Sequence, residues 1–253
     1  MINVERLEKH FDGRAAVRGV SFQVGRGEVV GFLGPNGAGK STTMRMIVGF
    51  LAPTAGRVWV DDLNVWEHPV AAQERIGYLP ENAPAYGDMT VEEFLSFVAE
   101  VRGFDGAERR SRVDAALERC LLNNVRRQPI ETLSKGYRQR TCFAQAILHD
   151  PPVLIMDEPT EGLDPNQKHV VREMIRRMGR EKTIILSTHI LEEVEAICSR
   201  AIIISSGTIV ADGAPADLRR SGAGGRERTL EEVFREKTRT ADVADAVGGE
   251  RRS

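Results

Sequence analysis

Apolar residues alternate with polar ones, or form short unbroken runs, at several places along the chain, and both patterns are typical of β-strands. The alternating segment at residues 17–24 predicts a half-buried strand, and the unbroken run at 153–156 predicts a buried one. The expected strands are residues 17–24, 29–33, 57–60, 76–80, 153–156, 183–186, 201–205 and 208–211.

Other segments place apolar residues at helical spacing. Thr90 and Glu93 form a capping box at the start of one of them, and Phe94, Leu95, Phe97 and Val98 follow at helical spacing. The expected helices are residues 42–48, 90–98, 107–122, 135–148, 166–178, 191–198 and 229–237.

The order of these elements predicts an α/β fold. From residue 135 onward strands and helices alternate, which indicates a mostly parallel sheet with helices on both faces. The first 80 residues are β-rich and predict an N-terminal antiparallel β subdomain, and residues 82–132 predict an inserted helical subdomain. We expect one domain at 1–220, then a Ser/Gly linker at 221–225, the short helix, and a disordered tail from residue 238.

Composition narrows the function classes. The chain has 253 residues and a formal net charge of −2, without the basic stripe of a nucleic-acid-binding domain. No apolar run approaches the roughly 18 residues that a membrane span needs, and residues 1–6 do not look like a signal peptide. The three cysteines lie far apart and fit a reduced cytosolic protein, in which they fill core or surface positions.

Residues 34–41 carry the strongest chemical signal. They fit the phosphate-binding pattern G-x-x-x-x-G-K-[ST] and lie between an expected strand and an expected helix. The eight residues are Gly34, Pro35, Asn36, Gly37, Ala38, Gly39, Lys40 and Ser41. The glycines let backbone N–H groups face an anion, and the helix N-terminus adds positive charge. We expect Lys40 to contact β- and γ-phosphates and Ser41 to ligate Mg²⁺. The alternative is a glycine-rich loop that fits by chance.

Two carboxylates follow the apolar run at 153–156. Ligands in open α/β sheets sit beyond the carboxyl ends of strands, so Asp157 is placed to hold Mg²⁺ and Glu158 to polarise an attacking water. The alternative is an ordinary Asp-Glu turn. Ser134 and Gly136 open the helix before this strand and create a second anion site at a helix N-terminus. The alternative for that pair is an ordinary capped helix.

Here the sequence resembles the nucleotide-binding subunit of ATP-binding cassette (ABC) transporters, over about residues 2–215. The motifs are the L-S-x-G signature at 133–136, a D-loop at 161–165 and a switch-histidine loop at 187–189. The resemblance implies a P-loop NTPase core that binds ATP with Mg²⁺. Its implied catalytic residues are Glu158, His189 and Lys40, and its implied metal ligands are Ser41, Glu81 and Asp157.

The resemblance also implies a head-to-tail dimer that sandwiches two ATP molecules. Each ATP would lie between one subunit's loop at residues 34–42, ending with Thr42, and the other's Ser134, Lys135 and Gly136. Asp164 would carry a signal between the two sites. Phe11 would stack on adenine, unless it is a core phenylalanine, and His189 would sense the γ-phosphate, unless it is a structural histidine.

Two departures from the family pattern are visible. Glu81 stands where the family usually has glutamine, and Lys135 and Tyr137 replace the commoner Gly and Gln of the signature. A carboxylate at position 81 can still ligate Mg²⁺ but adds negative charge near the γ-phosphate. The segment 78–82 is similar to a subgroup of exporter-type ATPases that includes the gliding-motility and copper-enzyme-maturation ATPases.

The resemblance favours a subunit that powers an ABC transporter whose membrane permease is a separate chain. We expect a homodimer, cytoplasmic and peripheral on the inner face of the cell membrane, with the permease docked on the helical lobe and no nucleic-acid partner. One alternative is a soluble ABC ATPase that acts on a ribosome or chromosome. Another is a different P-loop enzyme, such as a kinase or GTPase. No residue of this sequence identifies the transported cargo.

Overall fold

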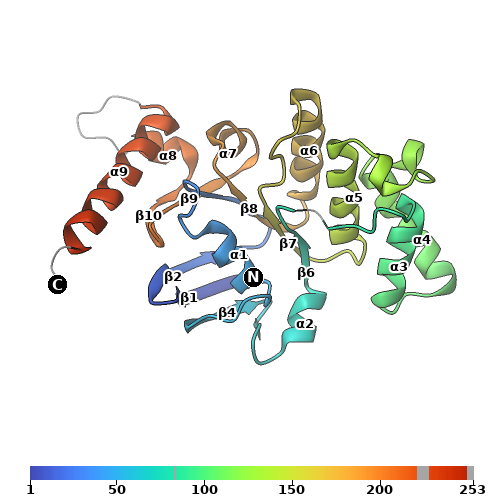
Figure 1. Cartoon of the computed structure of the whole chain (residues 1–253), viewed down its shortest axis with the longest axis horizontal. Helices are drawn as coiled ribbons and strands as arrows, with labels where there is room; N and C mark the ends of the chain where they lie inside the picture. The colour runs from blue at the N-terminus through green and yellow to red at the C-terminus, as the bar shows by residue number, and fades with distance from the viewer. Residues whose placement is uncertain (83, 221–227, 250–253) are drawn as a thin grey trace.

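A six-stranded sheet forms the centre of this computed structural model, which describes residues 1–82, 84–220 and 228–249 (Figure 1). Its strand order is β10-β9-β3-β8-β7-β6, and all neighbours are parallel except the β9–β10 pair. The strands are β3 (Val29–Leu33), β6 (Ile76–Leu79), β7 (Val153–Asp157), β8 (Thr183–Thr188), β9 (Arg200–Ser205) and β10 (Thr208–Gly213). The α/β class with a mostly parallel sheet is therefore confirmed.

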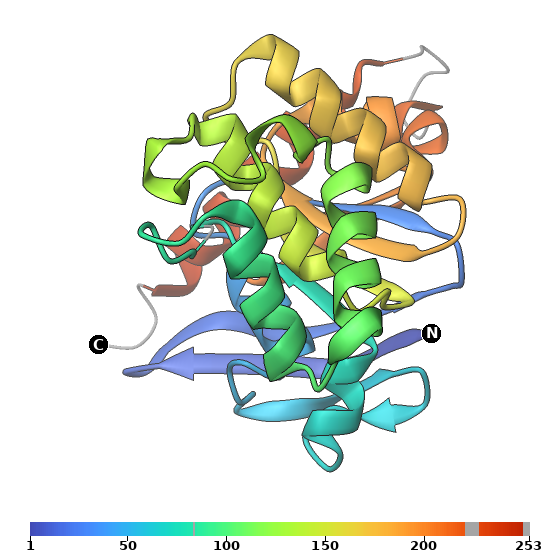
Figure 2. The same ribbon diagram turned by 90° about the vertical axis from the view of Figure 1, so that its right-hand side faces the viewer.

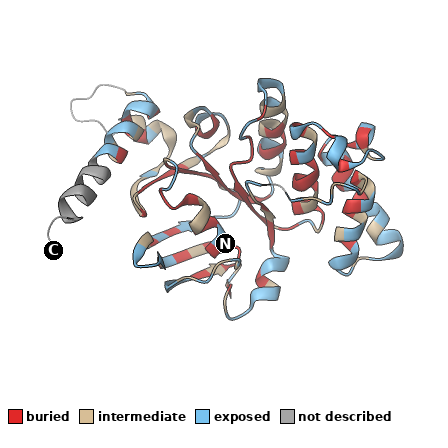
Figure 3. Ribbon diagram, in the orientation of Figure 1, coloured by how far each residue is buried: buried red, intermediate tan, exposed pale blue. Residues whose placement is uncertain are grey.

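Alternate residues of the central strands pack on opposite faces of the sheet. Ile155 of β7 joins a core with the helix α1 (Lys40–Ile47), whereas Leu154 and Met156 join a core with α5 (Lys135–Ile147) and α6 (Pro165–Met178). The strands are buried on both sides, as their unbroken apolar runs require (Figure 3). The helix α7 (Leu191–Ile197) packs on β3. Helices on both faces leave the carboxyl ends of the strands open to a ligand.

A second, antiparallel sheet lies on the α1 side, in the order β2-β1-β4-β5. Its strands are β1 (Ile2–Phe11), β2 (Arg14–Val24), β4 (Ala55–Val60) and β5 (Leu63–Asn64). The strand β1 was not expected. The first strand expected is 17–24, which puts Phe11 before it, and this placement is wrong because Phe11 ends β1. Register shifts between Val4 and Leu7, where Arg6 has a positive φ of 44°, break the alternation that marks a strand in sequence.

The segment expected as a helical lobe contains α3 (Val91–Val101), α4 (Gly106–Arg119), η1 (Asn123–Val125) and η2 (Ile130–Thr132). The capping box of Thr90 and Glu93 is present. Buried Phe94 and Leu117 share a core cluster with Phe143 of α5, so the lobe packs on the rest of the chain through that helix (Figure 2).

Three helices differ from expectation. The short helices α2 (Pro69–Glu74) and α8 (Pro215–Arg220) were not predicted, because each is too brief to show a helical period. The helix α9 (Leu230–Gly249) begins as expected but continues far past residue 237, so the expected disordered tail is wrong as far as Gly249. The linker expected at 221–225 and the tail residues 250–253 lie outside the described residues.

The start of α9 explains its length. Thr229 and Glu232 exchange backbone and side-chain hydrogen bonds, and Leu230 and Val233 are buried against β9 and β3. These contacts supply the costly first turn, after which each further residue adds to the helix at little cost. Within the residues that the structure describes, no helix combines the length and apolar character needed to cross a membrane.

Candidate ATP-binding and hydrolytic site

The loop at residues 34–39 joins β3 to α1 and is held between two backbone segments. A Cβ atom added to Gly34 would lie 2.5 Å from the carbonyl of Ile204, and one added to Gly39 would lie 2.6 Å from the carbonyl of Ala16. Gly39 also has φ of 104°, which side chains rarely adopt. These two positions therefore require glycine. The loop and the first turn of α1 border a cavity of about 300 Å³, lined by Ala16, Asn36, Gly37, Gly39, Lys40, Ser41, Thr42, Glu81, Glu158 and Glu161.

Lys40 lies at the base of this cavity with its ammonium group almost fully buried. Its Nζ donates to the carbonyl of Gly34 at 2.9 Å and to the carbonyl of Pro35 at 3.3 Å. It also lies 3.3 Å from Glu158 Oε1. A buried ammonium is stable only when it is paired in this way, and phosphate oxygens would meet the same need.

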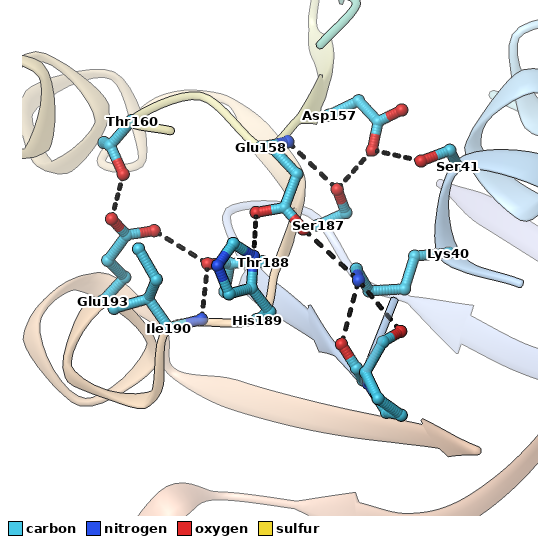
Figure 4. Close-up of polar contacts among 12 residues, drawn as sticks. Lys40, Ser41, Asp157, Glu158, Thr160, Ser187, Thr188, His189, Ile190 and Glu193 are labelled. Atoms are coloured by element: carbon cyan, nitrogen blue, oxygen red, sulfur yellow. Dashed lines mark hydrogen bonds and ion pairs between the residues drawn. The ribbon is translucent and has the colours of Figure 1, made fainter. Parts of the chain in front are cut away.

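Asp157 ends β7 with a fully buried carboxylate (Figure 4). Its Oδ1 accepts hydrogen bonds from the hydroxyls of Ser41, at 3.0 Å, and of Ser187. Its Oδ2 is buried and has no hydrogen-bond partner. An unpartnered carboxylate oxygen beside a serine hydroxyl, with Glu81 on the same cavity, is an oxygen-rich donor set that fits Mg²⁺.

Glu158 has an unusual backbone that turns its side chain into the cavity. Its φ of 48° lies in the left-handed region, which is strained for a residue with a Cβ atom. Its N–H donates to Ser187, to the hydroxyl at 3.0 Å and to the carbonyl at 3.2 Å. Its Oε2 lies 3.1 Å from His189 Nδ1. The two carboxylate oxygens of Glu158 therefore meet Lys40 on one side and His189 on the other (Figure 4).

His189 follows the carboxyl end of β8, and its side chain is 38% exposed. Because β7 and β8 are parallel neighbours with Asp157 opposite Ser187, the residues after both strands meet at one edge of the sheet. The geometry thus brings together Lys40, Ser41, Glu81, Asp157, Glu158 and His189, all named from sequence.

The signature residues lie elsewhere, at the N-terminus of α5. Ser134 caps this helix by accepting from the N–H of Tyr137, and both Ser134 and Lys135 are exposed. Gly136 lies against α6, where an added Cβ atom would come within 2.5 Å of Gln167 Oε1. None of these three residues lines the cavity beside Lys40.

Asp164 and Phe11 also lie outside the cavity. Asp164 is the N-cap of α6, and its carboxylate accepts from the N–H groups of Asn166 and Gln167 at 2.9 and 3.0 Å. Phe11 is 45% exposed at the end of β1, with Lys9 Nζ 5.1 Å from its ring centre. The neighbouring strand β2 contributes Ala16 to the cavity wall.

Sequence reasoning missed the residues that hold this site in place. Ser187 joins Asp157 to the backbone of Glu158, and Glu161 lines the cavity, yet neither was singled out. The signal for Ser187 is its register opposite Asp157 in the sheet, which becomes readable only when the strand order is known.

The chain matches known proteins over most of its length. The family model described as "ABC transporter" matches residues 17–161. The protein named Nod factor export ATP-binding protein I of Ralstonia nicotianae is 38% identical over 86% of this chain and 68% of its own length. The protein named ABC transporter ATP-binding protein NatA of Bacillus subtilis is 38% identical over 88% of this chain and 90% of its own.

A solved structure described as an ATP-binding subunit of an ABC transporter is similar in fold and sequence. It has a TM-score of 0.84 and 33% identity, and the match covers 94% of this chain and 99% of that one. The chain therefore belongs to the ABC transporter family, as an ATP-binding subunit and ATPase.

Proposed function

We propose that Glu158 is the general base with which this subunit hydrolyses ATP. The observation that carries this proposal is the position of its carboxylate, which lies on the cavity wall between Lys40 and His189 and opposite the phosphate-binding loop. A base must reach the proton that it removes, and this carboxylate faces the space that a γ-phosphate and its attacking water would share.

ATP entry changes the partners of the charged groups in this mechanism. The Lys40 ammonium pairs with the phosphate oxygens in place of Glu158, and Glu158 Oε1 is then free to accept a hydrogen bond from water. The water oxygen then forms a bond to the γ-phosphorus as the bond to the bridging β,γ-oxygen breaks, and the water proton passes to Glu158. His189 holds the other carboxylate oxygen and contacts the γ-phosphate.

A divalent cation fits the remaining oxygen groups. Ser41, Asp157 and Glu81 would hold Mg²⁺, which when bound supplies positive charge to the phosphate oxygens. The free Oδ2 of Asp157 supports this assignment, because a fully buried carboxylate oxygen without a partner is costly.

The active unit in this proposal is a homodimer. Ser134 and Lys135 are exposed and away from their own chain's cavity, so they are free to contact ATP held by a second copy. The N-terminus of α5 would then bring backbone N–H groups and a partial positive charge to the γ-phosphate. Asp164, at the N-terminus of α6, lies in the D-loop and would carry the signal between the two ATP sites.

A membrane permease is the partner that the subunit would drive. An apolar groove of about 1020 Å³ runs between the helical lobe and the main domain, and several of its lining side chains are large and exposed. Val101 and Val70 are each 70% exposed, and Tyr86 and Phe97 are 54% and 40% exposed. The groove includes Pro84, three residues after Glu81, so a helix docked there would be coupled to the cavity.

The direction of transport is proposed to be export. The name of one relative, a Nod factor export ATP-binding protein, supports export, and the segment at residues 78–82 supports an exporter type related to the gliding-motility and copper-enzyme-maturation ATPases. Docked on its permease, the subunit would lie on the inner face of the cell membrane.

Photo-crosslinking tests the partner directly. A photoreactive residue at Phe97 or Val101 should capture a membrane protein with several spans in the native host, and the same residue at exposed Arg110, on the outer face of α4, serves as the control. Capture of ribosomal or chromosomal proteins from Phe97 and Val101, and of no membrane protein, would contradict the permease assignment.

A further inference from the structure

Glu193 is a buried carboxylate that the hydrolytic mechanism described above does not use. It lies in the first turn of α7 and is 1% exposed. Its Oε1 accepts a hydrogen bond from the hydroxyl of Thr160, and its Oε2 accepts one of 2.9 Å from the hydroxyl of Thr188 (Figure 4). Arg172 of α6 approaches Oε1 at 3.7 Å.

The two hydroxyls come from the two segments that carry the reacting side chains. Thr160 lies two residues after Glu158, and Thr188 directly precedes His189. Glu193 touches neither Glu158 nor His189. It therefore ties together the backbones on either side of the Glu158–His189 contact, whose length is 3.1 Å.

Both threonine hydroxyls donate to the oxygens of Glu193. The oxygen of Thr188 accepts from the N–H of Ile190 at 3.0 Å, and its single proton is donated to Glu193. This pair of bonds spans His189 and sets the turn that presents its ring. A side chain at position 193 that cannot accept would leave the proton of the fully buried Thr188 hydroxyl without an acceptor.

Burial also argues that Glu193 has a specific role. Withdrawing a carboxylate from water is expensive unless it is paired, and its cation, Arg172, lies beyond hydrogen-bond distance. The hydroxyls of Thr160 and Thr188 are thus its direct partners.

We propose that Glu193 is a positioning residue for ATP hydrolysis: through Thr160 and Thr188 it holds His189 and Glu158 in register around the attacking water. This inference rests on the proposed role of Glu158, and it assigns a part in hydrolysis to a residue that lies outside the cavity. Glu193 contacts no part of the loop at residues 34–41, so it acts on the chemical step and not on ATP affinity.

The test compares Glu193→Ala with Glu193→Gln in the purified full chain, using ATP with Mg²⁺. We expect Glu193→Ala to lower kcat by about tenfold or more, because small displacements of catalytic groups have effects of this size, with ATP affinity within about twofold of wild type. Glu193→Gln should recover most of the rate, since its amide oxygen accepts from Thr188 and its NH₂ group donates to Thr160. Glu192→Ala, on the exposed side of the same turn, is the matched control.

A second pair of variants keeps the proposal testable if Glu193→Ala folds poorly. Thr188→Val removes only the hydroxyl and should lower kcat as Glu193→Ala does, whereas Thr188→Ser should not. Where both can be measured, Glu193→Ala combined with Thr188→Val should be no slower than the slower single variant, because both break one contact. Independent, multiplying losses would overturn the proposal.

The remaining outcomes separate this inference from the proposed function. A wild-type kcat in Glu193→Ala or in Thr188→Val, or a loss of ATP affinity in proportion to the loss of rate, would overturn the positioning role. If Glu158→Gln still hydrolyses ATP like the wild type, the base assignment fails instead, whatever Glu193→Ala does.

Discussion

The Lys40 ammonium lies 3.3 Å from Glu158 Oε1, and both side chains are 6% exposed. The cation of the phosphate-binding loop and the carboxylate proposed as the base therefore neutralise each other. Triphosphate oxygens compete for the same ammonium, so the binding of ATP would free the carboxylate at the moment when water must be activated.

Lys40→Ala should weaken ATP binding by at least about tenfold, since it removes a buried, charge-assisted donor to the phosphates. Titration with a fluorescent ATP analogue measures the Kd. Arg45→Ala, which removes an exposed cation from the same helix, should change the Kd by no more than about twofold. An unchanged affinity in Lys40→Ala would contradict the phosphate-binding role of the loop.

Glu158→Gln should retain ATP and lose turnover, because an amide cannot take the water proton; loss of a general base typically costs about 10²–10⁴-fold in rate. Because the ATP is not hydrolysed, it should also hold two subunits together as a stable dimer. Size-exclusion chromatography with ATP and Mg²⁺ should therefore show a dimer that is absent with ADP. A monomer under both conditions would count against the sandwich.

Ser134→Arg should leave the Kd of the monomer for ATP unchanged and abolish hydrolysis, because a long side chain at the exposed N-terminus of α5 keeps two subunits apart. ATP titration and ATPase assays on the same preparation measure the two effects. Ser134→Ala, which loses the hydroxyl and its cap bond but adds no bulk, should still form ATP-dependent dimers. Wild-type turnover in Ser134→Arg would mean that the signature serves only as a helix cap.

His149 should make the fold less stable in mild acid. Burial, with Arg102 as a further cause, lowers the pKa of His149 to about 4, while its Nε2 contacts the carbonyl of Ile76. In the unfolded chain His149 has a pKa near 6.5, so in mild acid it is protonated there while it stays neutral in the folded chain. Stability is full above about pH 6.5 and falls as the pH drops toward 4, by about 2 kcal/mol between pH 7.5 and 5.

Urea unfolding at pH 7.5 and 5.0 measures this loss. The variant His149→Gln keeps a donor for Ile76 but does not titrate, so its stability should change less between the two values. An equal change in both proteins would show that other groups carry the pH dependence.

The sequence was sufficient for elements with a clear period and for motifs at strand ends. The capping box at Thr90, the strand before Asp157 and the helix after Gly39 all appear where the pattern predicts them. These elements can be predicted from local sequence because one buried face or one cap determines each element. The strand β1 was missed because a bulge near Arg6 shifts its alternation.

The sequence predicted only those site residues that belong to a recognisable sequence motif. Ser187 and Glu193 act through partners that are distant in sequence, and their roles depend on the order of β7 and β8 and on the way α7 packs. For Asp164, the sequence motif predicts a signalling residue, and within one chain the structure gives it the contacts of a helix cap.

Glu81 and Glu158 line the same cavity, so either carboxylate is placed to act on a water beside the γ-phosphate. In the proposed mechanism Glu81 supplies a Mg²⁺ and water contact that an amide oxygen can replace. Glu81→Gln also removes a negative charge near the triphosphate, so it should bind ATP at least as tightly as the wild type.

The steady-state ATPase rates of Glu81→Gln and Glu158→Gln, measured side by side with Mg²⁺, test the central claim most directly. We expect Glu81→Gln to hydrolyse ATP at a rate comparable to the wild type and Glu158→Gln to be inactive. An inactive Glu81→Gln beside an active Glu158→Gln would contradict the assignment of Glu158 as the base.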